Sequence, residues 1–140
     1  MEKQNEMVLR PIGIVRSTLK NREECPKQGF ENGPEAEIIL EKCFREGVVG
    51  LDVGREIMVL TWLHLADRDK VKNIHPGGDL NRPPRGVFAT RSPSRPNPLG
   101  LHRAKILEMT ERGMKVAPLE VVDGTPVVDI KPVLEISREG

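Results

Sequence analysis

LHRAKILEMTERGMKVAP, residues 101–118, contains two runs in which apolar and polar residues largely alternate, separated by Glu111-Arg112-Gly113. Alternation with a period of two is typical of a β-strand that buries one face. A short connection containing glycine, placed between two such runs, favours a β-hairpin. The stretch therefore predicts two antiparallel strands, at residues 101–109 and 114–118.

The rest of the chain is divided into short segments by 12 prolines and 13 glycines, which leave little room for long helices. Residues 41–45 favour a short helical turn, and Asp123-Gly124 predicts a tight turn because Asp-Gly readily supplies a positive φ. Further strands are expected at residues 7–16, 36–40, 56–63, 86–89 and 127–130. This spacing indicates an all-β fold, an antiparallel β-barrel or sandwich with long loops and little helix.

Length and composition predict one domain, residues 1–140, with a single core. Only four residues are aromatic and none is tyrosine, so the core is expected to consist mainly of valine, isoleucine and leucine. No segment resembles a signal peptide or a membrane span of roughly 20 apolar residues, which predicts a cytoplasmic protein. Cys25 and Cys43 are interpreted as free thiols, and no residue cluster has the spacing of a metal site.

Residues 85–105, RGVFATRSPSRPNPLGLHRAK, form a basic segment that folding alone does not require. Its prolines restrict their own backbone and that of Ser92, Arg95 and Asn97 before them, which predicts a stiff loop. Residues 80–107 contain no Asp or Glu, although the whole chain is nearly balanced. Six basic residues stand in this window: Arg82, Arg85, Arg91, Arg95, Arg103 and Lys105. Most charged loops are simply solvated, but such local segregation favours an anionic partner.

Residues 66–85, which precede the basic segment, are polar, rich in glycine and proline and without periodicity. A loop of about 20 residues inside a compact domain is unusual unless it is functional. The two segments together therefore predict a functional loop region.

Several of these motifs resemble the TsaA-like (TrmO) family of S-adenosyl-L-methionine-dependent tRNA methyltransferases. The similar segments cover nearly the whole chain and include GVFATRSPSRPNPLG at residues 86–100 and DGTPVVDIKP at residues 123–132. The resemblance implies a β-barrel, a homodimer, S-adenosylmethionine as cofactor and the anticodon loop of tRNA as partner. The implied reaction is methylation of N6 of the threonylcarbamoyl-adenosine at tRNA position 37.

The resemblance also implies the residues that bind the cofactor: Gln28, Gly29, Phe30, His64, Leu65, Arg91, Leu101, Val121, Val122, Asp123 and Gly124. The chain lacks the GxGxxG and GxxxxGK[ST] motifs, which excludes a Rossmann-type site, so the cofactor is expected at the loops of a barrel rim or beside a second subunit. Without the resemblance, the residues alone favour core packing for Leu101, Val121 and Val122, and a strand-end histidine for His64. Arg91 suits either the methionine carboxylate or the substrate.

Four residues are catalytic candidates: Asp129, Lys131, Arg95 and Asn97. Asp129 and Lys131 share one face of a predicted strand. They form either a surface ion pair of little energetic worth, or a catalytic pair in which Asp129 accepts a proton and Lys131 stabilises developing negative charge. Arg95 and Asn97, on the stiff loop, suit the threonine carboxylate of the modified base, and Arg95 also suits developing negative charge.

Two other functions remain open at this point. One is a non-catalytic β-barrel that binds RNA, against which stand the low net charge and the lack of aromatic residues expected to be exposed for base stacking. The other is a methyltransferase of the same lineage that acts on a small anionic metabolite. Salt dependence separates RNA binding from small-ligand binding, because only contacts with several phosphates weaken steeply with salt.

Overall fold

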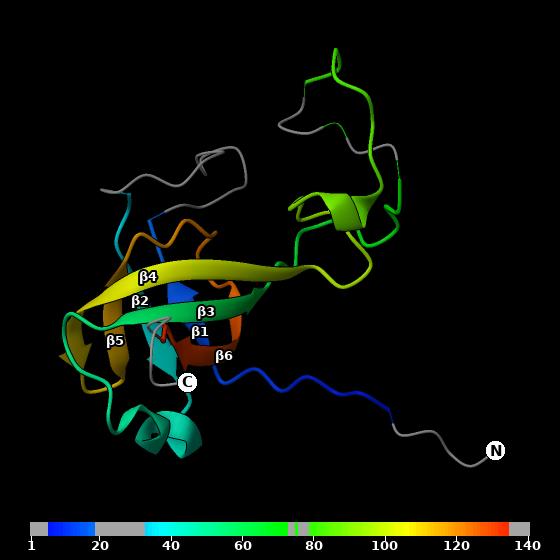
Figure 1. Cartoon of the computed structure of the whole chain (residues 1–140). Helices are drawn as coiled ribbons and strands as arrows, with labels where there is room; N and C mark the ends of the chain where they lie inside the picture. The colour runs from blue at the N-terminus through cyan, green and yellow to red at the C-terminus, as the bar shows by residue number, and fades with distance from the viewer. Residues whose placement is uncertain (1–5, 19–32, 73–74, 76–78, 135–140) are drawn as a thin grey trace.

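Six antiparallel strands form a closed barrel in the computed structural model, which describes residues 6–18, 33–72, 75 and 79–134. The strands are β1 (Gly13–Arg16), β2 (Ala36–Leu40), β3 (Glu56–Trp62), β4 (Leu99–Thr110), β5 (Gly113–Ala117) and β6 (Pro126–Pro132). Their order around the barrel is β1-β2-β5-β4-β3-β6, and pairing between β6 and β1 closes it (Figure 1). The predicted all-β barrel is therefore confirmed.

The hairpin predicted from residues 101–118 is present, with Thr110 opposite Gly113 at the β4–β5 turn. The predicted tight turn is also present, and Gly124 has a φ of 87°. A helical turn, η2 (Lys42–Val48), covers the segment expected to form one, but it is a 3-10 helix.

Two strand predictions differ from the structure. The expected strand at residues 7–16 begins only at Gly13, because Pro11 lacks an amide donor for a ladder. Residues 86–89 were expected to form a strand, which is wrong: Val87–Ala89 form a 3-10 turn, η4. The Ala89 and Thr90 amides donate back to the carbonyls of Gly86 and Val87, at 3.0 Å each, so these groups are satisfied locally.

The core consists of side chains that point into the barrel at every second strand position, as in β2 and β3. Closure gives each of the six strands a paired neighbour on both sides. As expected from the composition, aliphatic residues dominate the buried cluster: Val15, Ala36, Ile38, Leu40, Ile57, Val59, Ala104, Ile106, Met114, Val116, Leu119, Val121 and Val127.

The antiparallel order gathers three of the five connections between strands at one end of the barrel, called here the loop rim. Strands β1, β3 and β5 end there, and β2, β4 and β6 begin there. The β1–β2, β3–β4 and β5–β6 connections therefore start and finish at this rim, whereas η2 lies at the opposite end (Figure 1). The arm is the name used here for residues 63–98, and its described residues (63–72, 75 and 79–98) extend away from the barrel wall (Figure 1). No helix among the described residues is long and apolar enough to cross a membrane.

Candidate functional site

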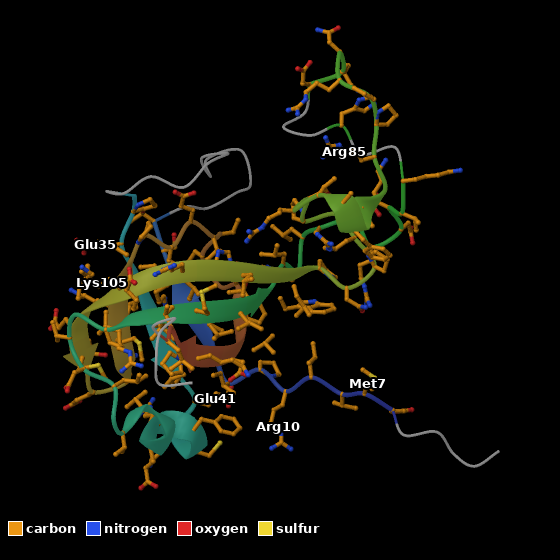
Figure 2. All side chains as sticks on the ribbon, in the orientation of Figure 1. Met7, Arg10, Glu35, Glu41, Arg85 and Lys105 are labelled. Atoms are coloured by element: carbon orange, nitrogen blue, oxygen red, sulfur yellow. The ribbon has the colours of Figure 1, made fainter. Side chains whose placement is uncertain are left out.

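An open pocket of about 470 Å³ lies beside the loop rim, where β1 ends and β2 begins. Its lining residues are largely polar and carry both signs of charge: Arg16, Ser17, Thr18, Glu35, Ala36, Glu37, Lys115 and Asp123. This volume is in the range of small-molecule sites, and the mixed charge suits a ligand with both anionic and cationic groups. We call it the rim cavity; Figure 2 labels Glu35 at its edge.

The turn at Asp123-Gly124 is fastened to the end of β1. Asp123 Oδ1 accepts a hydrogen bond from the Ser17 amide at 2.9 Å, and the Gly124 amide donates to the Val15 carbonyl at 2.7 Å. These contacts hold the Asp123 carboxylate at the cavity wall. Of the neighbouring predicted cofactor residues, Val121 is buried in the core, whereas Val122 is only partly buried.

Arg95, predicted to contact substrate, directs its guanidinium at the backbone of its own loop. Its Nη1 donates to the carbonyls of Thr90 and Ser92 at 3.2 and 3.0 Å, and its Nη2 to the carbonyl of Val87 at 3.4 Å. Three of the five N–H donors of the side chain are thus engaged within the arm. Arg95 fixes the shape of the loop that carries Arg91, which is exposed.

Arg68 joins the two ends of the arm and had no assigned role in the sequence analysis. Its guanidinium carbon lies 5.0 Å from the centroid of the Trp62 ring, in a cation–π contact at the end of β3. Its Nε donates to the Pro96 carbonyl at 2.8 Å, and its Nη2 to Asn97 Oδ1 at 3.4 Å. Asn97, predicted to contact RNA, is therefore held by Arg68. The only signal in the sequence was that Arg68 lies in the aperiodic segment 66–85.

His102 is a second residue without an assigned role, and it lies on β4 opposite Val59, whose side chain is buried in the barrel. Its Nε2 is 2.9 Å from the hydroxyl of Thr61, which is fully buried. Gly100 allows this contact, since a Cβ there would lie 2.5 Å from Thr61 Oγ1 and 2.6 Å from His102 Nε2. Burial, and secondly the positive charge of Arg91, lower the pKa of His102 to about 4, so the ring is neutral at pH 7.

Asp129 and Lys131 share a face, as predicted, but it is the outer wall of the barrel. The pairing of β3 with β6 has a register shift between Leu60 and Thr61. As a result, Asp129 lies opposite Leu60, and Leu60 lies opposite Leu101 of β4 on its other side. Leu101, Leu60 and Asp129 thus form a row across the outside of β4, β3 and β6. Asp129 and Lys131 are exposed, and Asp129 Oδ1 accepts a hydrogen bond from the Ile130 amide at 2.9 Å.

The predicted site residues therefore fall into separate groups. Asp123 lines the rim cavity, His64, Leu65 and Arg91 are exposed on the arm, and Leu101 lies on the outer wall with Asp129. Gln28, Gly29 and Phe30 lie outside the described residues, as does Cys25. Cys43 is a free, exposed thiol, and the described part of the chain contains no cluster of three potential metal ligands.

Comparison with known proteins matches residues 14–137 to the tRNA-methyltransferase O N-terminal domain. The chain belongs to this family. A probable S-adenosyl-L-methionine-binding protein from Methanothermobacter thermautotrophicus is 43% identical over 130 residues, which are 93% of this chain and 92% of the relative. An S-adenosyl-L-methionine-binding protein from Archaeoglobus fulgidus is 42% identical over 125 residues, 89% of this chain and 88% of the relative.

Solved TrmO structures have the same fold as this TrmO-family domain. TrmO from P. aeruginosa is 26% identical with a TM-score of 0.73, and a second TrmO structure is 25% identical with a TM-score of 0.74. Each match covers 99% of this chain but only 62% of the TrmO chain. The family predicted from the motifs at residues 86–100 and 123–132 is thereby confirmed.

Proposed function

We propose that this protein is an S-adenosylmethionine-dependent methyltransferase that acts, as a homodimer, on N6 of threonylcarbamoyl-adenosine beside the tRNA anticodon. The observation that carries the proposal is the loop rim. The β1–β2, β3–β4 and β5–β6 connections start and finish at this rim. Every predicted cofactor residue belongs to one of these connections except Leu101, which is near the start of β4. Membership of the TrmO family and the names of its relatives support the same cofactor.

The rim cavity suits the cofactor by the chemistry of its lining. S-adenosylmethionine carries a carboxylate, an ammonium group and a sulfonium, and the cavity offers Arg16 and Lys115 for the first and the carboxylates of Glu37 and Asp123 for the others. The Ser17 amide fixes Asp123 in place, so this carboxylate requires little reorganisation on binding.

When bound, the cofactor supplies an electrophilic methyl group, whose bond to sulfur breaks as a bond to N6 forms and the N6 proton leaves. The carbamoyl group withdraws electron density from N6, so the reaction needs a proton acceptor and a nearby cation. Asp129 is assigned the first role and Lys131 the second. Both side chains are exposed on β6 and accessible to a large substrate.

The separation of the predicted residues supports the homodimer. Arg91 on the arm and Leu101 on the outer wall do not line the rim cavity with Asp123. In a dimer, the arm or wall of one copy completes the site at the rim of the other, and Arg91 is then free to bind the methionine carboxylate or the tRNA. Sedimentation at micromolar concentration measures this state, and a monomer that binds the cofactor fully would contradict it.

The test is calorimetric titration with S-adenosylmethionine, followed by addition of tRNA with or without the threonylcarbamoyl group. Saturable cofactor binding, with methyl transfer only to the modified tRNA, is expected. Salt-sensitive tRNA binding without cofactor binding would indicate an RNA-binding barrel, and methyl transfer to neither tRNA would favour a small-molecule substrate.

Asp129 is tested separately in single-turnover methyl transfer. Asp129→Asn removes the proton acceptor and is expected to lower the rate by about 100-fold or more, in line with general-base contributions. Asp52→Asn, an exposed carboxylate on the loop beside η2 at the opposite rim, is the matched control and should leave the rate unchanged. Full activity of Asp129→Asn across the pH range would remove Asp129 from the mechanism.

A further inference from the structure

Phe88 is a large aromatic side chain that the fold leaves in solvent. It is 79% exposed, although the composition gave no expectation of an exposed aromatic residue. Its neighbour Val87 is completely buried. The 3-10 turn η4 therefore directs one apolar side chain inward and presents the other outward.

The exposure of Phe88 is fixed by hydrogen bonds on both sides of it. The Val87 amide donates to the Val71 carbonyl at 2.8 Å, which ties η4 to the first part of the arm. The Val87 carbonyl accepts from the amide and hydroxyl of Thr90, at 3.0 and 2.9 Å, and from Arg95 Nη2. A side chain on such a fixed turn loses little conformational entropy when it contacts a ligand.

The charge around Phe88 identifies the kind of ligand. Arg85 and Arg91 are each three residues from Phe88, within about 11 Å along the chain, and both are exposed. No acidic residue occurs between Leu80 and Leu107. Figure 2 shows Arg85 on the arm, well away from the barrel. An aromatic face among cations matches a nucleic acid strand, in which each unpaired base offers a stacking surface next to phosphates.

We propose that Phe88 is a stacking platform for an unpaired base of the RNA substrate, with Arg85 and Arg91 contacting the adjacent phosphates. The inference rests on the RNA partner of the proposed function and adds a site to it. The ligand is a single-stranded loop, because bases in a duplex are already stacked and have no free face.

The experiment compares binding of an anticodon stem–loop RNA with that of a fully paired RNA of equal length, both without cofactor. Phe88→Leu keeps an apolar side chain but removes the aromatic face, and it should weaken stem–loop binding by about tenfold, within the range for loss of one stacked base. Its affinity for the duplex should equal that of the wild type. Phe88→Trp should retain stem–loop affinity, and its fluorescence should be quenched on binding.

Two controls separate stacking from other effects. Val49→Ala removes an apolar side chain that is 84% exposed beside η2 at the opposite rim, and it should leave both affinities unchanged. Phe88→Leu should keep the wild-type dependence of affinity on salt, whereas Arg91→Gln should reduce the slope of log affinity against log salt by about 0.7, the contribution of one phosphate contact.

Three results would overturn the proposal: unchanged stem–loop affinity in Phe88→Leu, an equal loss for the duplex, or altered sedimentation showing that Phe88 lies between two copies of the chain. Stem–loop binding that depends on Phe88 but without methyl transfer would refute the proposed reaction alone. Methyl transfer with normal stem–loop affinity in Phe88→Leu would refute this inference alone.

Discussion

The barrel packs 13 buried apolar side chains into one cluster, whereas the described part of the arm buries only Val87 and Pro98. The arm is ordered instead by donors that reach backbone carbonyls, chiefly those of Arg68 and Arg95. Burial is distributed over many residues, but the shape of the arm depends on a few hydrogen bonds. The difference predicts that substitutions in the barrel change global stability, and that substitutions in the arm change local order and binding.

The largest effect is expected in the barrel core. Ile57 is fully buried, and Ile57→Ala should lower the free energy of unfolding by about 2–5 kcal/mol, through lost transfer energy and the cavity left behind. Ile14, 37% exposed on the outer face of β1, offers the same substitution outside the core, and Ile14→Ala should cost well below about 1 kcal/mol. Urea denaturation measures both, and equal losses would contradict a core confined to the barrel interior.

The next effect concerns His102 of β4. Its pKa of about 4 in the folded protein is below the usual 6.5, so the unfolded chain binds the proton more tightly. Stability should therefore be full above pH 6.5 and fall as the pH decreases towards 4. At about 1.4 kcal/mol for each pKa unit, the loss attributable to His102 is about 3 kcal/mol.

The measurement compares unfolding of the wild type and His102→Gln across this pH range, because carboxylates titrate in both proteins and cancel in the difference. The His102 ring can also be titrated directly by NMR, among only three histidines. Arg91→Gln should raise this pKa, since the charge on the arm lowers it. An unchanged pKa in that variant would show that the arm and the barrel interior are electrostatically independent.

The barrel could be predicted from the sequence because its signal is local and repeated. The alternating pattern at residues 101–118 predicted the β4–β5 hairpin, and Asp123-Gly124 predicted the tight turn before β6. The error at residues 86–89 has the opposite cause. Val87 and Phe88 have strand-like composition, but no strand in the described part of the chain pairs with them, and the amides of Ala89 and Thr90 bond locally.

The candidate site was less predictable because it depends on register and on long-range contacts. The shift between Leu60 and Thr61 determines that Asp129 faces outward, and no sequence pattern encodes it. Likewise, a stiff basic loop was predicted, but Arg95 bonding its own backbone and Arg68 stacking on Trp62 require the folded arrangement. Composition favoured an anionic partner, and only the fold shows which cations remain exposed.

We expect the smallest effect on stability for two arginines of the arm, Arg91 and Arg95. They test whether the arm can change without the barrel. Arg95→Gln removes donors to three carbonyls, whereas Arg91→Gln removes the same charge from a side chain that donates no hydrogen bond to another described residue. Neither should change the free energy of unfolding by more than about 1 kcal/mol, because an arm that opens locally leaves the barrel intact.

Hydrogen exchange distinguishes the two arginine variants. The amides of Ala89 and Thr90 are bonded within η4, whose Val87 carbonyl also accepts from Arg95, so Arg95→Gln should speed their exchange by about tenfold for each 1.4 kcal/mol of lost local stability. Arg91→Gln should leave these rates unchanged while weakening RNA binding. Equal exchange rates in both variants would mean that the prolines alone hold the loop, and Arg95 would then be available for substrate. Faster exchange in Arg95→Gln alone would show that Arg95 holds the shape of the loop, and weaker RNA binding by Arg91→Gln with unchanged exchange would show that Arg91 contacts the ligand.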